Sequence, residues 1–101
     1  MRAHSAEVKS GTKTTISCVI TGITSPINVK WLESSGGVIE MDADNYTPNS
    51  GTLDNRRQTA TLEVKGATED KTFTCRVIFP GSSSYDTDVQ LNVYGGFLGW
   101  Y

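Results

Sequence analysis

Apolar and polar residues alternate along most of this chain, in short runs separated by residues typical of turns. The runs at residues 16–20, 27–31 and 73–79 each place an apolar side chain at every second position. Because successive side chains of a β-strand point to opposite faces, each run predicts a strand with one buried face. The full pattern predicts strands near residue 8 and at residues 14–20, 27–32, 59–64, 72–79 and 85–94, with further short strands at 38–41 and within 42–55.

The number and spacing of these runs indicate the fold class. No stretch keeps a helical period for more than two turns, and turn signals recur roughly every 8–12 residues, as in antiparallel sandwiches. The chain has 101 residues, of which 37% are hydrophobic, which suits a single core. We therefore predict one all-β domain over residues 1–95, a two-layer antiparallel sandwich with Greek-key connections and seven or eight strands.

The last residues differ in composition from the rest of the chain. Two glycines end the last predicted strand, and four of the five residues that follow are large and apolar, namely Phe97, Leu98, Trp100 and Tyr101. An exposed apolar patch of this kind favours association. We interpret residues 96–101 as a linker to a following domain or a non-native remnant, with a docking segment as the alternative.

Two cysteines and a tryptophan occupy inward positions in the predicted strands. Cys18 and Cys75 lie 57 residues apart, with Trp31 between them. Together with their flanking segments, TISCVITG, VKW, ATLEV and FTCRV, they resemble strands B, C, E and F of the immunoglobulin superfamily. The resemblance extends over about residues 5–94. The interval between Trp31 and Cys75 leaves little room for the extra strands of a variable domain, so an intermediate- or constant-like set is favoured.

The resemblance implies how the core is held together. In this family a disulfide between Cys18 and Cys75 would join the two sheets beside Trp31, with Leu62 and Phe73 packed in the same core. Phe73 stands where the family often has tyrosine, so the packing is expected to remain without the tyrosine's hydrogen bond. Two reduced, buried thiols are the alternative.

Charge and residue content argue against several function classes. The formal net charge of −2 provides no basic field for nucleic acid or an anionic membrane. No run approaches the roughly 18 apolar residues of a membrane span. The single histidine, His4, precedes the predicted strands, and Glu40, Asp42 and Asp44 lack the spacing of a calcium-binding loop. We predict no enzyme activity, no cofactor, no metal and no direct membrane insertion by this segment.

Protein binding is the remaining function class, and the outward face of strands 27–32, 72–79 and 85–94 is one candidate surface. Two aliphatic residues interrupt the polar pattern on this face beside a cation. Exposed aliphatic groups flanked by charge are typical of modest protein contacts. The candidate residues are Leu32, Arg76 and Ile78.

The predicted hairpin tip at residues 80–85 is the second candidate surface. It combines small hydrogen-bonding residues with one aromatic side chain, a composition used by binding loops. Its candidate residues are Pro80, Ser83 and Tyr85. Separately, Asn45-Tyr46-Thr47 is an N-glycosylation sequon on a predicted sheet edge, where a glycan would discourage edge-to-edge pairing.

The sequence favours a non-catalytic extracellular recognition module of a cell-surface receptor, adhesion or immune-type protein. Its expected partner is another protein, including a second copy of itself, and its expected route is the secretory pathway, with neighbouring domains in the full-length chain. An intracellular structural immunoglobulin module of a muscle-type filament protein is the main alternative. A carbohydrate-binding domain attached to an enzyme is a third.

Overall fold

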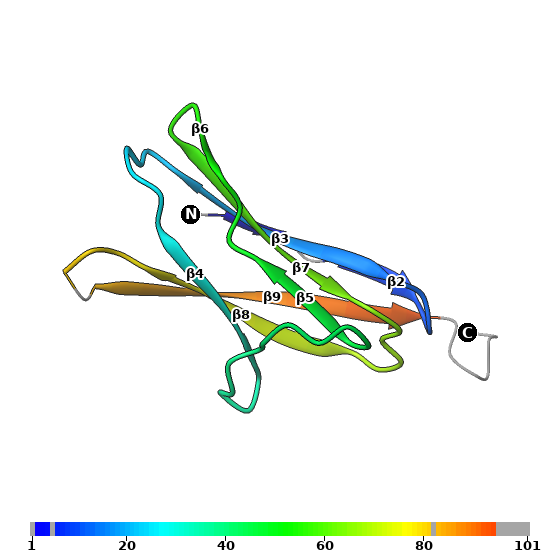
Figure 1. Cartoon of the computed structure of the whole chain (residues 1–101). Helices are drawn as coiled ribbons and strands as arrows, with labels where there is room; N and C mark the ends of the chain where they lie inside the picture. The colour runs from blue at the N-terminus through cyan, green and yellow to red at the C-terminus, as the bar shows by residue number, and fades with distance from the viewer. Residues whose placement is uncertain (1, 5, 82, 95–101) are drawn as a thin grey trace.

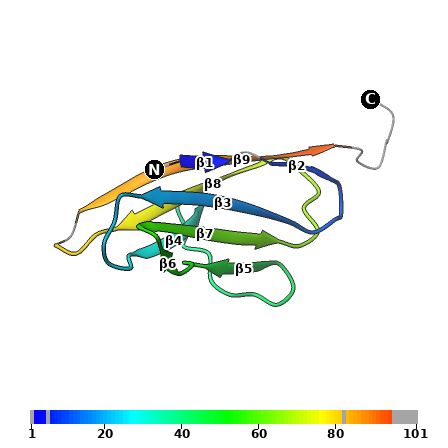
Figure 2. The same cartoon turned by 90° about the horizontal axis from the view of Figure 1, so that it is seen from above.

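The computed structural model is a two-layer β-sandwich, and it describes residues 2–4, 6–81 and 83–94 (Figures 1 and 2). One sheet has the order β1-β3-β7-β5, with β6 also paired to β7, and the other has the order β2-β9-β8-β4. The strands are β1 (Arg2–His4), β2 (Ala6–Lys9), β3 (Thr14–Thr21), β4 (Asn28–Glu33), β5 (Tyr46–Asn49), β6 (Leu53–Asp54), β7 (Arg57–Val64), β8 (Lys71–Ile78) and β9 (Ser84–Tyr94). The predicted all-β sandwich is confirmed. The described residues contain no helix long and apolar enough to cross a membrane.

The N-terminal segment forms two strands where the sequence predicts one. β1 pairs antiparallel with β3, placing Ala3 opposite Cys18. β2 then crosses to the other sheet and pairs parallel with β9, placing Val8 opposite Val93. His4 therefore lies in a strand, although the sequence pattern places the first strand near residue 8. The predicted tail at residues 96–101 lies outside the described residues.

The connection between the two sheets after β4 also differs from the prediction. The strand predicted at residues 38–41 is reduced to one isolated bridge between Val38 and Leu32. The predicted region 42–55 holds two short strands, β5 and β6, and both pair with β7. Asn55 and Arg56 join β6 to β7 with φ angles of 52° and 62°, as a tight two-residue hairpin turn requires.

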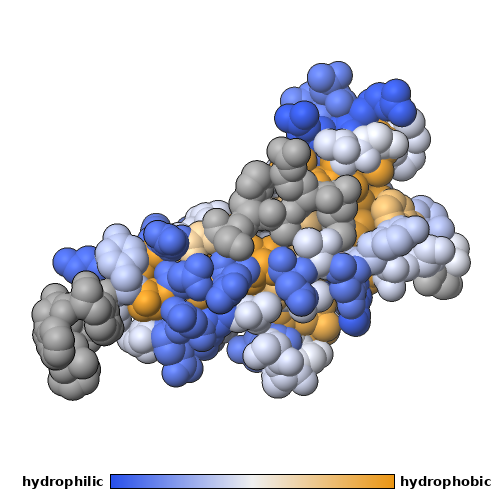
Figure 3. Space-filling model, turned by 180° about the vertical axis from the view of Figure 1, so that it is seen from behind, coloured by the Kyte–Doolittle hydropathy of each residue, from blue (hydrophilic) through white to orange (hydrophobic). Residues whose placement is uncertain are grey.

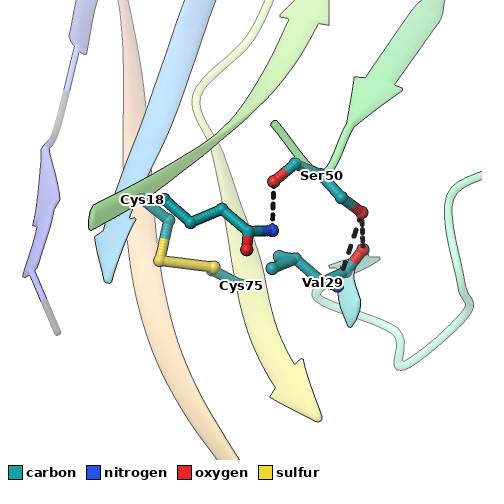
Figure 4. The surroundings of a disulfide bond; sticks show 5 residues. Cys18, Val29, Ser50 and Cys75 are labelled. Atoms are coloured by element: carbon teal, nitrogen blue, oxygen red, sulfur yellow. Dashed lines mark hydrogen bonds between the residues drawn. A yellow bond between two sulfur atoms is a disulfide. The ribbon is translucent and has the colours of Figure 1, made fainter. Parts of the chain in front are cut away.

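The core lies between the two sheets and contains the residues that the resemblance implies. Trp31 and Phe73 are each 1% exposed, and Leu62 is fully buried. Cys18 on β3 and Cys75 on β8 are also fully buried and form a disulfide, with their Cα atoms 6.5 Å apart (Figure 4). Because β3 and β8 belong to different sheets, this bond joins the two layers. The predicted disulfide is confirmed.

Candidate functional site: two protein-binding surfaces

The outer face of β4, β8 and β9 carries a row of charged side chains across three strands. Lys30 lies opposite Arg76, and Arg76 lies opposite Asp86. The Nε atom of Arg76 donates to Oδ1 of Asp86 at 2.9 Å, and its Nη2 atom donates to Oδ2 at 3.0 Å. This bidentate geometry fixes the guanidinium plane against the sheet. Lys30, Arg76 and Asp86 are called the charged row below.

The charged row influences the ionisation of its own members. The hydrogen bonds from Arg76 hold the pKa of the Asp86 carboxyl below its ordinary value, and the same pair raises the pKa of Arg76. A carboxyl with a lowered pKa in the folded state adds stability at neutral pH that is lost as the pH falls through that lowered value. The contribution is small because both side chains are solvent-exposed. The pair therefore orients Arg76 more than it stabilises the domain.

Leu32 does not lie exposed on this face, and that part of the sequence prediction is wrong. Leu32 is only 4% exposed, and its neighbour Trp31 is buried as well. The chain returns beside β4 at this point, since Leu32 bridges Val38 and the amide of Ile39 donates to the carbonyl of Trp31 at 2.8 Å. Ile78 is half-buried. The predicted patch of two exposed aliphatic residues is therefore absent, and the outer face is mainly polar.

The hairpin between β8 and β9 forms the second surface. Pro80 and Ser83 are exposed, and the amide of Phe79 donates to the carbonyl of Ser83 at 2.8 Å, which closes the hairpin. Tyr85 belongs to β9 and is 63% exposed. Its ring meets the ring of Phe79 edge to face, with centroids 5.7 Å apart. Tyr85 alternates with Asp86 along β9, so it points away from the charged row.

The sequon residue Asn45 is exposed at a tight turn just before β5. Its Nδ2 atom donates to Oδ2 of Asp42 at 2.8 Å, while Oδ1 of Asp42 accepts from the amide of Asp44 at 3.0 Å. The first of these hydrogen bonds is the main reason that the pKa of Asp42 is lowered. The carboxylate of Asp42 is thus used within its own turn. Within residues 2–4, 6–81 and 83–94, no group of three or more acidic, histidine or cysteine side chains is arranged to hold a metal ion.

Gln58 is a structural residue that the sequence analysis missed. It lies on β7 and is only 1% exposed. Its Oε1 atom accepts from the amide of Ile27 at 3.0 Å, and its Nε2 atom donates to the carbonyls of Ile27 at 2.8 Å and Ser50 at 2.7 Å. The hydroxyl of Ser50 in turn contacts both the amide and the carbonyl of Val29 (Figure 4). Gln58 and Ser50 thus satisfy backbone groups of Ile27, just before β4, and of Val29 on its outer edge. Unpaired backbone groups at a sheet edge favour pairing with another chain.

Replacing Gln58 by methionine is expected to lower the free energy of unfolding by about 2–3 kcal/mol, because it removes three hydrogen bonds and leaves buried backbone groups of Ile27 unpaired. Methionine keeps the length of the side chain, so the loss is not one of volume. Urea unfolding of both proteins, followed by circular dichroism, measures the difference. Gln90→Met, at an exposed position on β9, is the control and is expected to change stability by less than about 0.5 kcal/mol.

Comparison with solved structures finds the same fold in several proteins. The M1 domain from titin has a TM-score of 0.70 and 22% identity, over 92% of this chain and 90% of that one. Dpr1 IG1, solved bound to DIP-eta IG1, has a TM-score of 0.71 and 14% identity, over 93% and 91% of the two chains. The RIG-5 IG1 homodimer has a TM-score of 0.67 and 15% identity, over 89% of each chain.

These structural likenesses are too low in identity to show more than the fold. A search of curated proteins by sequence finds no match. The chain belongs to the immunoglobulin C1-set family, whose model matches residues 1–82, and this confirms the sequence assignment to an intermediate- or constant-like set.

Proposed function

We propose that this domain is a non-catalytic extracellular recognition module that docks another protein through the outer face of β4, β8 and β9. The observation that carries the proposal is the charged row. Asp86 already holds the Arg76 guanidinium in one orientation, so little side-chain freedom is lost when a partner binds it. Arginine is enriched among the residues that dominate binding energy. The matching partner surface presents a carboxylate to Lys30 and Arg76, surrounded by polar groups.

Two further features support the extracellular part of the proposal. The buried Cys18–Cys75 disulfide is typical of proteins that fold in an oxidising compartment. Asn45 lies exposed at a turn, where an N-linked glycan can be attached without disturbing the core. The intracellular structural role is the competing function, since titin domains share this fold.

Mass spectrometry of the protein isolated from its natural source separates the two compartments. The extracellular proposal expects an oxidised Cys18–Cys75 pair, and it expects peptide-N-glycosidase to release a glycan and convert Asn45 to aspartate. Reduced cysteines together with an unmodified Asn45 in freshly alkylated material would instead support the intracellular structural role.

A charge reversal tests the proposed binding face. The domain, displayed as a fluorescent tetramer, is applied to cells of its source tissue, and the Arg76→Glu variant is expected to bind at least tenfold more weakly, a loss of about 1.4 kcal/mol or more. Lys13→Glu is the matched control, because Lys13 is an exposed cation outside the β4–β8–β9 sheet. Equal binding by the two variants would show that the charged row is not the docking face.

A further inference from the structure

A hollow of about 440 Å³, lined by both apolar and polar side chains, opens between the end of β3 and the start of β9. Figure 3 shows hydrophobic residues gathered on this side of the molecule, between the end that carries β6 and the β8–β9 hairpin. Ile23 and Phe79 pack partly against the core, and Tyr85 is 63% exposed above them. This hollow is called the end groove below. Its apolar lining comes from Ile20, Ile23, Phe79 and Tyr85, and Thr21, Asp86 and Thr87 supply polar groups beside Gly22.

Unpaired strand edges border the end groove on two sides. β1 pairs with residues 17–19 of β3, so Ile20 and Thr21 have no strand partner on that side within the described part of the chain. β2 pairs with β9 from Leu91 onwards, so residues 84–90 have no described strand hydrogen-bonded to them on the side away from β8, although β1 passes close to β9. Unpaired backbone donors and acceptors beside a hollow that contains exposed aromatic surface are suited to an extended peptide with large side chains.

The sequence itself contains such a peptide. Residues 95–101 read GGFLGWY, with two leading glycines followed by four large apolar residues, of which Phe97, Trp100 and Tyr101 are aromatic. Aromatic side chains bury about 150–250 Å² each and dominate the energetics of small contacts. A segment of this composition gains stability when another surface removes it from water.

The part of the end groove around Tyr85 is beyond the reach of this segment in the same chain. Tyr85 precedes Tyr94 by nine residues on one continuous strand, which places the two residues about 30 Å apart. Trp100 follows Tyr94 by six residues and can extend at most about 21 Å from it, even when the segment turns straight back along β9. A second copy of the chain is not subject to this limit.

We propose that residues 95–101 of one copy dock in the end groove of a second copy, with Phe97 or Trp100 inserted between Ile23 and Tyr85. The donor segment adds an extended strand beside the free edge of β9. The two surfaces in contact are different, so the contact is head-to-tail and can repeat from copy to copy. The association does not depend on the compartment of the proposed function, although Asp86 of the charged row also lines the end groove.

Light scattering coupled to size exclusion tests this association in the full chain. The contact is small, so the average mass is expected to rise from that of a monomer between about 10 µM and 1 mM. Two variants are each expected to remain monomeric: Tyr85→Ser, which opens the groove, and the double substitution Phe97→Ser with Trp100→Ser, which removes the donor rings. Met41→Ser, which removes another exposed apolar side chain, is expected to associate like the natural sequence.

Mixing the two monomeric variants is the decisive measurement. The variant with Phe97→Ser and Trp100→Ser retains an intact groove, and the Tyr85→Ser variant retains an intact C-terminal segment. The mixture is therefore expected to form a one-to-one dimer and no larger oligomers. Circular dichroism and urea unfolding of each variant check that both are folded. A natural chain that stays monomeric to 1 mM would overturn the proposal. Variants that still self-associate, or folded variants that stay separate when mixed, would overturn it as well.

Discussion

Reducing the Cys18–Cys75 disulfide is expected to lower the free energy of unfolding by about 4 kcal/mol at 25 °C. The two cysteines are separated by 57 residues in sequence, and closing a loop of that length restricts the unfolded chain by about this amount in the chain-entropy account. Domains of this size are stable by only about 5–15 kcal/mol. The reduced domain is therefore expected to be marginal at 37 °C. Urea unfolding with and without dithiothreitol, followed by circular dichroism, gives the difference.

A double substitution separates the cross-link from the packing of the sulfur atoms. In the reduced natural chain both sulfurs remain in the core, whereas Cys18→Ala with Cys75→Ala removes them. The double variant is expected to lose stability further than the reduced chain, because both positions are fully buried and the change leaves a cavity. A loss of less than about 1 kcal/mol on reduction would contradict the prediction. It would also favour the intracellular structural role, in which such a domain must be stable without a disulfide.

The core was predictable because burial imposes a period of two on the sequence. Leu62 and Phe73 occupy the inward phase of their strands, and the structure buries both. Cys18 and Cys75 have the same inward phase, so they lie between the two facing sheets, where they form a disulfide. The additional division of the N-terminal strand was not predictable, since β1 and β2 are too short for alternation to show where the chain changes sheets.

The exposure of surface residues was harder to predict, because it depends on which other segments of the chain pack beside the strand. Leu32 has the phase of an outward residue, but the return of the chain at residues 37–39 places Val38 opposite it. Gln58 has the phase of an inward residue and carries a polar amide, so alternation alone gave no reason to extend the strand to it. Its role depends on backbone groups of Ile27 and Ser50, which alternation within the strand cannot identify.

The edge of β4 shows how these polar contacts bear on binding. Gln58 and Ser50 satisfy backbone groups of Ile27 and Val29, and Ile39 satisfies the carbonyl of Trp31. The edge of β9 from residues 84 to 90 has no described strand hydrogen-bonded to it on the side away from β8, although β1 passes close to β9. Along the edge of β4 the backbone groups of Ile27, Val29 and Trp31 are thus occupied, while part of the β9 edge has no hydrogen-bonded strand among the described residues. This asymmetry favours a one-directional association over symmetric pairing of like edges.

Among the glycines that the structure describes, Gly51 is the one at which an added methyl group is expected to cost the most stability. Its φ angle is +80°, and a Cβ atom there would lie 2.8 Å from the carbonyl carbon of Thr59 and nearer still to its oxygen. The obstacle is backbone of the central strand β7, which cannot move aside as a flexible side chain does. Ser50, which contacts Val29 and Gln58, is the adjacent residue, so any displacement of Gly51 also disturbs those hydrogen bonds.

Gly51→Ala is accordingly expected to lower the free energy of unfolding by about 3–4 kcal/mol, from the clash and the left-handed backbone together. Gly66→Ala is the matched control, because Gly66 has a φ angle of +73° but no atom within 4 Å of the added Cβ position. That variant bears only the backbone cost and is expected to lose about 1 kcal/mol. Urea unfolding of the two variants measures both losses. Equal losses would mean that Thr59 yields to the methyl group, and that the connection between β5 and β6 is not held as tightly as these contacts indicate.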